Sequence, residues 1–264
     1  MLLAIDIGNT QLFAGLFLGN QIVLRFRKSS KSQLTSDEYG LFLRSILREN
    51  GFDPDKITAV VMSSVVPDLL YSVQAACAKY LKLRPLVLNS SSEKIQLGLK
   101  LDVHHPQEVG SDRIATAIAA EFLYPQENKL IVDFGTATTF SFVTAKSEWK
   151  GGLIAPGFRT SMEALSLNTA QLPQVEIQKP NVLIGRNTIE NIQAGLYFGA
   201  LGLAREVISR LKQEHQGRPE FKSLRVIATG GFSQLFKEEK LFDHVEPDLV
   251  LLGLWRLYDL NKDN

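Results

Sequence analysis

The stretch AIDIGNT, residues 4–10, joins an apolar run to an acid, a glycine and two small polar residues. A short apolar run bounded by turn residues is typical of a buried strand, and Gly8-Asn9 is typical of a turn. Asp6 therefore lies near the end of a buried strand, where a carboxylate is uncommon unless it is paired or has a function. The same arrangement recurs around Asp133 in IVDFGTATT, residues 131–139. These two acid-tipped strands, far apart in the sequence, are the basis of our functional prediction.

The composition is that of a globular protein with no strong charge bias. Of its 264 residues, 45% are hydrophobic and 22% charged, and the formal net charge is +1. This balance offers no field that would attract nucleic acid or a membrane surface. The most basic stretch, RFRKSSKS at residues 25–32, has no aromatic ladder and is interpreted as a solvated strand end and loop. The single cysteine, Cys77, cannot form an internal disulfide, and the chain shows neither a signal peptide nor an apolar run of about 18 residues. We therefore expect a cytoplasmic protein without nucleic-acid or membrane partners.

The first half of the chain predicts three strands followed by alternating helices and strands. Short turns separate the three opening strands, as in two consecutive hairpins. Thr35 and Glu38 are spaced as a capping box at the start of the first helix. The expected strands are 2–7, 12–18, 21–26, 57–66 and 84–89, and the expected helices are 35–50, 68–81 and 108–122.

The second half begins in the same way, with an acid-tipped strand that leads into two neighbours. A long helix follows, and it places Gly195, Gly199 and Gly202 on one face. That face indicates close helix packing, either within the chain or against a second copy. The expected strands are 129–134, 138–145, 148–156 and 225–231, and the expected helices are 187–213 and 249–260.

The turn after the first strand has the chemistry of a phosphate site. Gly8 permits a positive φ and lets a ligand approach the backbone, while Asn9 and Thr10 offer hydrogen-bond donors. Asp6 would repel a phosphate directly, so its expected role is to hold a cation that the phosphate also touches. The alternative for this motif alone is an ordinary hairpin turn whose Asp accepts bonds from nearby amides.

Two further segments repeat or extend this chemistry. DFGTATT supplies Asp133, Gly135, Thr136 and Thr138 in the same order as the first turn. ATGG, residues 228–231, ends a strand in two glycines, against which a flat ring such as adenine could lie, although this motif alone is also common in turns. The sequence lacks the G-x-x-x-x-G-K-[ST] and G-x-G-x-x-G nucleotide motifs. The three segments in this order therefore indicate a nucleotide site of another type.

Asp112 and Arg113 are the candidates for chemistry on an acceptor. They lie in the first turn of the helix that begins near Gly110 or Ser111, where free amides favour anions. Arg113 suits a carboxylate, and the pair could hold a small anionic acceptor with its hydroxyl at Asp112. The alternative for Asp112 is a purely structural first-turn acid. Because the helix start stabilises the charged carboxylate, we expect Asp112 to be a weak base.

The combination of these motifs resembles the type III pantothenate kinases. The resemblance implies a fold of two ribonuclease-H-like domains with mixed sheets, as in the actin-like ATPases, with a nucleotide cleft between residues 1–124 and 125–264. It also implies ATP-dependent phosphorylation of pantothenate, the first step of coenzyme A synthesis, by a homodimer that uses Mg²⁺ and a monovalent cation, K⁺ or NH₄⁺. The motifs, which span nearly the whole chain, are DIGNT (6–10), SSVVP (63–67), PQEVGSDR (106–113), DFGTATT (133–139), GGLIAPG (151–157), IGRNT (184–188) and TGG (229–231).

The resemblance also assigns residues by position. It makes Asp112 the general base and Asp133 the ligand of the monovalent cation, beside Asp6 as a holder of metal. ATP contacts fall on Asp6, Ile7, Gly8, Asn9, Thr10, Gln11, Leu12, Phe13 and Thr136. Pantothenate contacts fall on Gly110, Ser111, Asp112, Arg113 and Thr188.

Two positions depart from the family pattern. Val103 stands where the family usually has a tyrosine that lines the substrate pocket, and Ser141 stands where it often has an acid. Neither departure removes a proposed catalytic group. Two other functions remain compatible with the sequence: a kinase for another small hydroxylated acid, and an ATP-binding regulatory or accessory protein on the same fold. The Asp112-Arg113 pair favours an enzyme, because a nucleotide switch does not need it.

Overall fold

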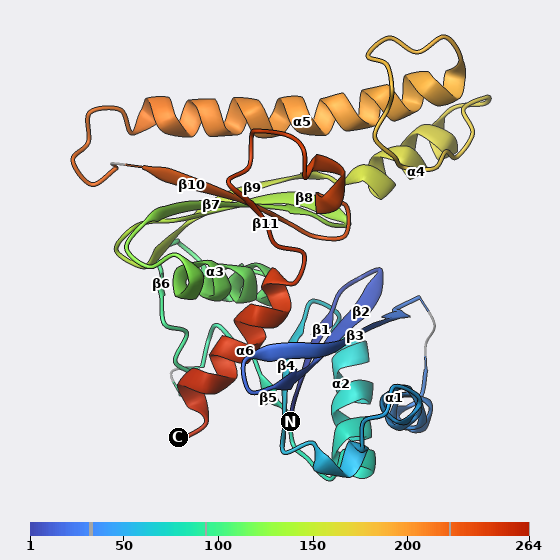
Figure 1. Cartoon of the computed structure of the whole chain (residues 1–264), viewed down its shortest axis with the longest axis vertical. Helices are drawn as coiled ribbons and strands as arrows, with labels where there is room; N and C mark the ends of the chain where they lie inside the picture. The colour runs from blue at the N-terminus through green and yellow to red at the C-terminus, as the bar shows by residue number, and fades with distance from the viewer. Residues whose placement is uncertain (32–33, 93, 222, 264) are drawn as a thin grey trace. The chain divides into compact units, whose positions relative to one another are not determined.

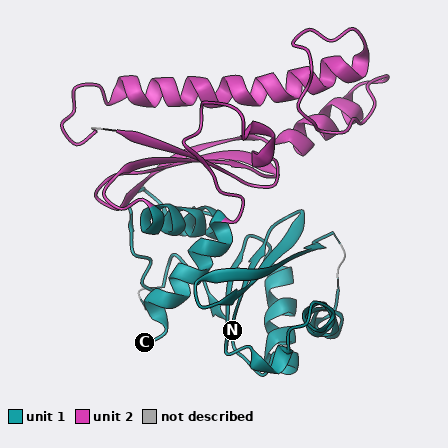
Figure 2. Ribbon diagram, in the orientation of Figure 1, with its two compact units in different colours: residues 1–123, 249–264 teal, residues 124–248 magenta. Residues whose placement is uncertain are grey.

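The computed structural model describes residues 1–31, 34–92, 94–221 and 223–263. Ser32, the last residue of the basic stretch interpreted as a loop, lies outside the described residues. The chain forms two compact units, which Figure 2 shows in different colours. Unit 1 comprises residues 1–123 and 249–264, and unit 2 comprises residues 124–248.

Unit 1 is built on a mixed sheet in the order β3-β2-β1-β4-β5. The two opening hairpins pair antiparallel, and β4 and β5 add in parallel to the other side of β1. The predicted three-strand meander is thus confirmed. Its strands are β1 (Leu2–Ile7), β2 (Gln11–Leu18), β3 (Gln21–Ser29), β4 (Ala59–Ser64) and β5 (Leu86–Val87).

Helices cover both faces of this sheet (Figure 1). One face packs against α1 (Ser36–Glu49), which begins with the predicted Thr35–Glu38 capping box, and α2 (Pro67–Ala76), which continues as a π-helical turn (Cys77–Leu81). The other face packs against α3 (Ser111–Leu123) and α6 (Leu249–Asn261). Short elements complete the unit: η1 (Pro54–Lys56), β6 (Lys100–Leu101) and η3 (Pro106–Glu108).

Unit 2 repeats the strand order of unit 1. Its strands lie in the order β11-β10-β7-β8-β9, with β7 in the place of β1 and the parallel strand β10 in the place of β4. The duplicated pattern that the sequence predicted is therefore a duplicated topology, and the predicted mixed α/β class is confirmed. The strands are β7 (Asn128–Phe134), β8 (Ala137–Val143), β9 (Glu148–Pro156), β10 (Leu224–Thr229) and β11 (His244–Val245).

The long helix α5 (Thr188–Glu214) runs along this sheet in Figure 1, and its N-cap is Asn187, the first residue of the predicted helix. Among the described residues, no helix combines the length and apolar character needed to cross a bilayer. Two helices were not predicted from the sequence: α4 (Phe158–Asn168), whose only buried residues are Phe158 and Met162, and the short η4 (Ser233–Phe236).

The C-terminal helix differs from our expectation. The sequence assigned residues 125–264 to the second domain, whereas α6 belongs to unit 1. Its Leu251, Leu254 and Leu257 are fully buried in the core that unit 1 builds around α3. Gly253 explains the fit, because a Cβ atom there would collide with the backbone of Ala115 on α3. The helix therefore completes the unit in which the chain began.

Candidate active site

Asp6 lies near the carboxyl end of β1, in the middle of the sheet of unit 1. In register, it is flanked by Phe13 on β2 and by Ser63 on β4. The hydroxyl of Ser63, which is fully buried, donates a hydrogen bond of 2.7 Å to Oδ1 of Asp6. A charge-assisted bond of this kind fixes the position of the carboxylate. The acid at the end of the first strand is therefore held by its neighbour in the sheet.

The turn after β1 is closed by its own backbone. Gly8 N–H donates to the Gln11 carbonyl at 3.1 Å, and Ser30 N–H donates to the Thr10 carbonyl at 3.0 Å. Neither Gly8 nor Asn9 has a positive φ, so the reason that the sequence analysis gave for Gly8 is wrong in that respect. The tight turn itself favours glycine here, because a Cβ atom on Gly8 would lie only 3.2 Å from the Gln11 carbonyl oxygen.

Burial divides the eight residues predicted to contact ATP in this segment. Ile7, Leu12 and Phe13 are buried in the two cores of unit 1, so their part in ligand binding is limited to the backbone. The side chains that reach solvent belong to Asp6, Asn9, Thr10 and Gln11. Polar groups thus concentrate in the turn and at the adjacent strand ends.

The start of α3 is fastened to the end of β4. The Ile114 N–H donates to the Gly110 carbonyl at 3.2 Å, which makes Gly110 the residue that caps the helix. The hydroxyl of Ser111 accepts a bond from Ser64 N–H at 2.9 Å and donates one to the Ser64 carbonyl at 2.8 Å. Because its hydroxyl is engaged in this way, we expect Ser111 to meet a substrate through its backbone.

Asp112 is half-buried in the first turn of α3, and its Oδ1 accepts a bond of 2.8 Å from Arg113 N–H. Burial raises the pKa of Asp112 above its usual value, and this effect outweighs the lowering by the Arg113 amide and by the charge of Arg113. The expectation that the helix start would make Asp112 a weak base is therefore wrong. The helix field is present, but loss of hydration is the larger effect. A raised pKa makes this carboxylate a better proton acceptor.

Asp133 has the corresponding place in unit 2, near the carboxyl end of β7. In register, it is flanked by Thr139 on β8 and Thr229 on β10. Gly230 follows β10 with φ +91°, and a Cβ atom there would collide with Oδ1 of Asp133 and with the backbone of Phe134. The first glycine of ATGG therefore allows the ends of β7 and β10 to approach closely, and this structural role does not depend on a ligand.

The turn at Thr136 is held by the segment that starts α4. The Thr136 carbonyl accepts bonds from Gly157 N–H at 3.1 Å and from the Thr160 hydroxyl at 2.7 Å. Gly157 is required because a side chain there would collide with the carbonyl oxygens of Gly135 and Thr136. The Thr136 side chain is exposed, while the backbone of its turn is held by the bonds from Gly157 and Thr160.

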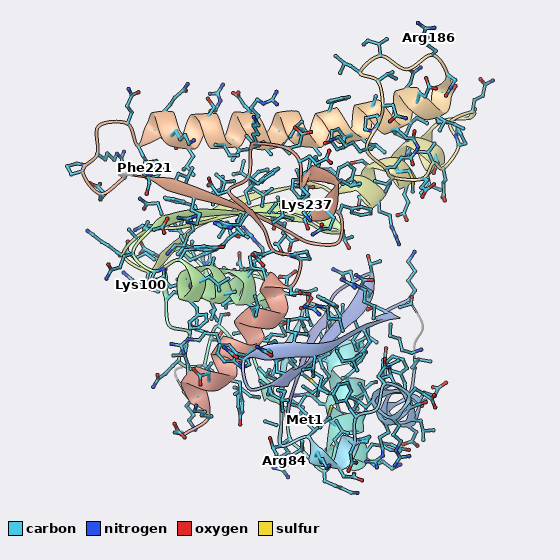
Figure 3. All side chains as sticks on the ribbon, viewed as in Figure 1. Met1, Arg84, Lys100, Arg186, Phe221 and Lys237 are labelled. Atoms are coloured by element: carbon cyan, nitrogen blue, oxygen red, sulfur yellow. The ribbon has the colours of Figure 1, made fainter. Side chains whose placement is uncertain are left out.

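Thr188 is the first residue of α5 and is exposed. It lines a cavity of about 700 Å³, together with Lys179 and with Arg186, which is labelled in Figure 3. Neither Asp133 nor Thr136 is among the residues that line this cavity. Within unit 2, the predicted site residues therefore fall into two places, the end of β7 and the start of α5.

Comparison with known proteins gives this arrangement a family. The family model described as type III pantothenate kinase matches residues 2–210. A Legionella pneumophila (strain Paris) protein named type III pantothenate kinase is 46% identical over 254 residues, which cover 96% of each chain. The chain belongs to the type III pantothenate kinase family.

Solved structures agree with the fold. A Campylobacter jejuni protein described as a Baf family transcriptional activator has a TM-score of 0.59 at 17% identity and covers 99% of this chain and 100% of its own. A Porphyromonas gingivalis protein described as an N-acetylglucosamine kinase has a TM-score of 0.52 at 14% identity, with the same coverage. At these identities the similarity concerns the fold, which is the actin-like fold of the sugar kinases. The predictions of family and fold are confirmed.

The cation sites expected for this family rest on single carboxylates. Among the described residues, no three His, Cys, Asp or Glu side chains gather into a metal site. Mg²⁺ commonly binds through one or two carboxylates, completed by waters and substrate phosphates, so the oxygen donors of Asp6 suit it. Asp133 offers a single carboxylate in unit 2, and its assignment to a monovalent cation remains a prediction.

Sequence reasoning assigned no role to Ser63 and Ser64, although it recognised SSVVP as a family motif. Ser63 bonds to Asp6, and the backbone of Ser64 bonds to Ser111. The signal that could have found them was positional: they end the parallel strand beside β1, and carboxyl ends of parallel strands are where sites form. In this kinase family member, β4 therefore links the predicted nucleotide acid to the predicted catalytic helix.

Proposed function

We propose that this protein transfers the γ-phosphoryl group of ATP to the primary hydroxyl of pantothenate, which yields ADP and 4'-phosphopantothenate and begins coenzyme A synthesis. Membership of the family supports this proposal. The observation that carries it is the arrangement around β4 in unit 1. Ser64 of this strand bonds to Ser111, which precedes Asp112 and Arg113, and Ser63 of the same strand bonds to Asp6 on β1. The reaction needs one carboxylate to accept the proton of the alcohol and another to hold the metal ion that binds the phosphates; Asp112 and Asp6 can take these two roles.

Each group then has a role in the transfer. Arg113 binds the carboxylate of pantothenate, and Asp112 orients the hydroxyl and accepts its proton as the new P–O bond forms and the bond to ADP breaks. Mg²⁺, when bound, neutralises charge on the phosphates, and Asp6 would hold it. Asp133 would hold K⁺ or NH₄⁺, and Thr136 and Thr188 would contact ATP and pantothenate respectively. Such transfer depends mainly on positioning and charge neutralisation.

The test is ADP release by the purified protein with and without pantothenate, in potassium buffer and then in sodium buffer. We expect ADP release to require pantothenate and to be faster in potassium. If a different hydroxylated acid stimulates ADP release and pantothenate does not, the protein is a kinase with another substrate. ATP binding without turnover on any small acceptor would favour a regulatory protein instead.

We also propose that the protein is a homodimer that associates along α5. Apart from the backbone of the helix itself, no described atom lies within 4 Å of a Cβ added at Gly195, Gly199 or Gly202, so these glycines do not serve close packing within the chain. Near its start, Ile184 and Ile189 are 80% and 52% exposed. Light scattering after size exclusion should give a dimer, and Gly199→Glu should give a monomer. A monomeric wild-type protein would disprove this assignment.

A further inference from the structure

Arg27 on β3 belongs to the same row of the sheet as the predicted nucleotide acid. Arg27 pairs in register with Phe13, Phe13 pairs with Asp6, and Asp6 pairs with Ser63. Residues directly opposite one another on neighbouring strands point to the same face of a sheet. Arg27 therefore lies on the face of Asp6, which is the face that packs against α3 and carries Asp112 at its edge.

The guanidinium of Arg27 is held in place by an aromatic ring. Its Cζ lies 3.9 Å from the centre of the Phe13 ring, within the range of a cation–π interaction. Phe13 is buried, whereas Arg27 is exposed. The rigid ring thus orients a long side chain that would otherwise be mobile at a surface, and this lowers the entropy that the side chain would lose on binding an anion.

Among the residues that the structure describes, no anion accounts for the charge of Arg27. In the part of the chain that the structure describes, Arg27 forms no ion pair and no hydrogen bond through its guanidinium, unlike Arg44, which pairs with Asp55. All five guanidinium N–H donors remain available to a ligand. The basic stretch that the sequence analysis interpreted as solvated thus contains one cation with a fixed position and an unused donor set.

This cation stands beside the predicted phosphate turn. Two residues beyond Arg27, Ser29 pairs with Gln11 at the start of β2, and the next residue, Ser30, donates its N–H to the Thr10 carbonyl. Two residues of strand span about 7 Å, which an extended arginine can reach. The turn itself provides amides and hydroxyls but no positive charge, and Asp6 adds a negative one. One Mg²⁺ at Asp6 would leave part of the negative charge of a triphosphate unneutralised, so a cation from the protein would add to its stabilisation.

We propose that Arg27 binds the terminal phosphate of ATP and stabilises its charge during transfer. Arg27 donates N–H bonds to phosphate oxygens and keeps all its protons; the bonds that form and break are those of the reaction proposed above. The inference rests on that function for its effect on turnover, but it also predicts a binding effect that requires no acceptor.

The test uses three substitutions in the full-length protein. Arg27→Met keeps an unbranched apolar side chain on the Phe13 ring and removes the charge. Arg27→Lys keeps the charge but lacks the planar set of N–H donors of the guanidinium group. Lys28→Gln is the matched control: Lys28 is the adjacent residue, its ammonium lies 4.8 Å from the ring of Phe42, and it points to the other face, toward α1. Calorimetry with ATP, ADP and AMP, and pantothenate-dependent ADP release, are the two measurements.

We expect Arg27→Met to weaken ATP binding about tenfold, to leave AMP binding within about twofold, and to lower kcat about a hundredfold or more. Arg27→Lys should fall between, and Lys28→Gln should match the wild type. Unchanged ATP affinity and kcat in Arg27→Met, or equal losses for ATP and AMP, would overturn the inference. If the wild type binds ATP but does not use pantothenate, the proposed function fails, and the nucleotide series still decides the role of Arg27.

Discussion

Two electrostatic effects oppose one another at the carboxyl group of Asp112. The amides at the start of α3 and the charge of Arg113 favour the ionised form, while burial disfavours it, and burial is the larger effect on its pKa. Sequence reasoning could place Asp112 in a first helical turn, because the apolar spacing of the helix is visible. It could not weigh burial against the helix field, because burial depends on how β4 and α6 pack around α3.

The raised pKa of Asp112 predicts the pH dependence of the reaction. A general base must be ionised, so kcat/KM should fall as the pH drops through the pKa of this carboxyl group. Because burial raises that pKa, the acidic limb should have its midpoint above the ordinary aspartate value of about 3.9. A profile of kcat/KM between pH 4 and pH 8 at saturating ATP measures it. A flat profile down to the ordinary value would contradict the role of Asp112.

Replacing Asp112 by Asn should lower activity and raise stability together. We expect kcat to fall more than about a hundredfold while ATP affinity survives, because the amide cannot accept the proton. The folded-state pKa of Asp112 is raised, so its contribution to stability is fully present below the unfolded value of about 3.9 and is lost as the pH rises through the folded value. At pH 7, Asp112→Asn should therefore melt at a higher temperature than the wild type, and at pH 3.5 the difference should vanish. Unchanged turnover in this variant would remove Asp112 as the base.

At the scale of elements, the junction between β4 and α3 decides where Asp112 stands. Ser111→Ala removes the hydroxyl that satisfies both the N–H and the carbonyl of Ser64. Leaving such half-buried groups unpaired costs about 1–3 kcal/mol, and a freed helix start should lower kcat about tenfold with little change in ATP affinity. Urea unfolding and steady-state kinetics measure the two effects.

A matched control for this junction is Ser166→Ala. The Ser166 hydroxyl donates a bond of 3.1 Å to the Glu163 carbonyl within the same helix, α4. It should change neither stability nor kcat beyond the error of the measurements. If Ser111→Ala behaves like this control, the tie between β4 and α3 does not position Asp112.

The elements that the sequence predicted well are those with their own local signals. The capping box at Thr35, the cap at Asn187 and the two-residue turn after Leu18 each fix an element end within a few neighbours. The start of α4 has no such signal, because its N-cap, Gly157, makes no side-chain bond. The Ser63–Asp6 and Ser64–Ser111 bonds join residues 57 and 47 positions apart, so only the folded sheet brings them together.

At the scale of the whole molecule, the duplication was visible in the sequence and the domain boundary was not. Both units place an acid at the end of a strand flanked by a hairpin partner and a parallel neighbour. That repeat follows from local patterns, which are similar in the two halves. The return of α6 to unit 1 follows from the fit of Gly253 against α3, a long-range contact that no local pattern reports.

The place of α6 makes a prediction about cooperative stability. Leu254 is fully buried in the core of unit 1, so Leu254→Ala should cost about 2–5 kcal/mol, and the loss should be confined at first to that unit. Hydrogen exchange followed by mass spectrometry should show reduced protection in β1, β4 and α3, with β7 and β10 unchanged. Leu201→Ala, in the core of unit 2, should produce the reverse pattern. If Leu254→Ala instead exposes β7 and β10, the helix belongs with residues 125–248, as the sequence alone had suggested.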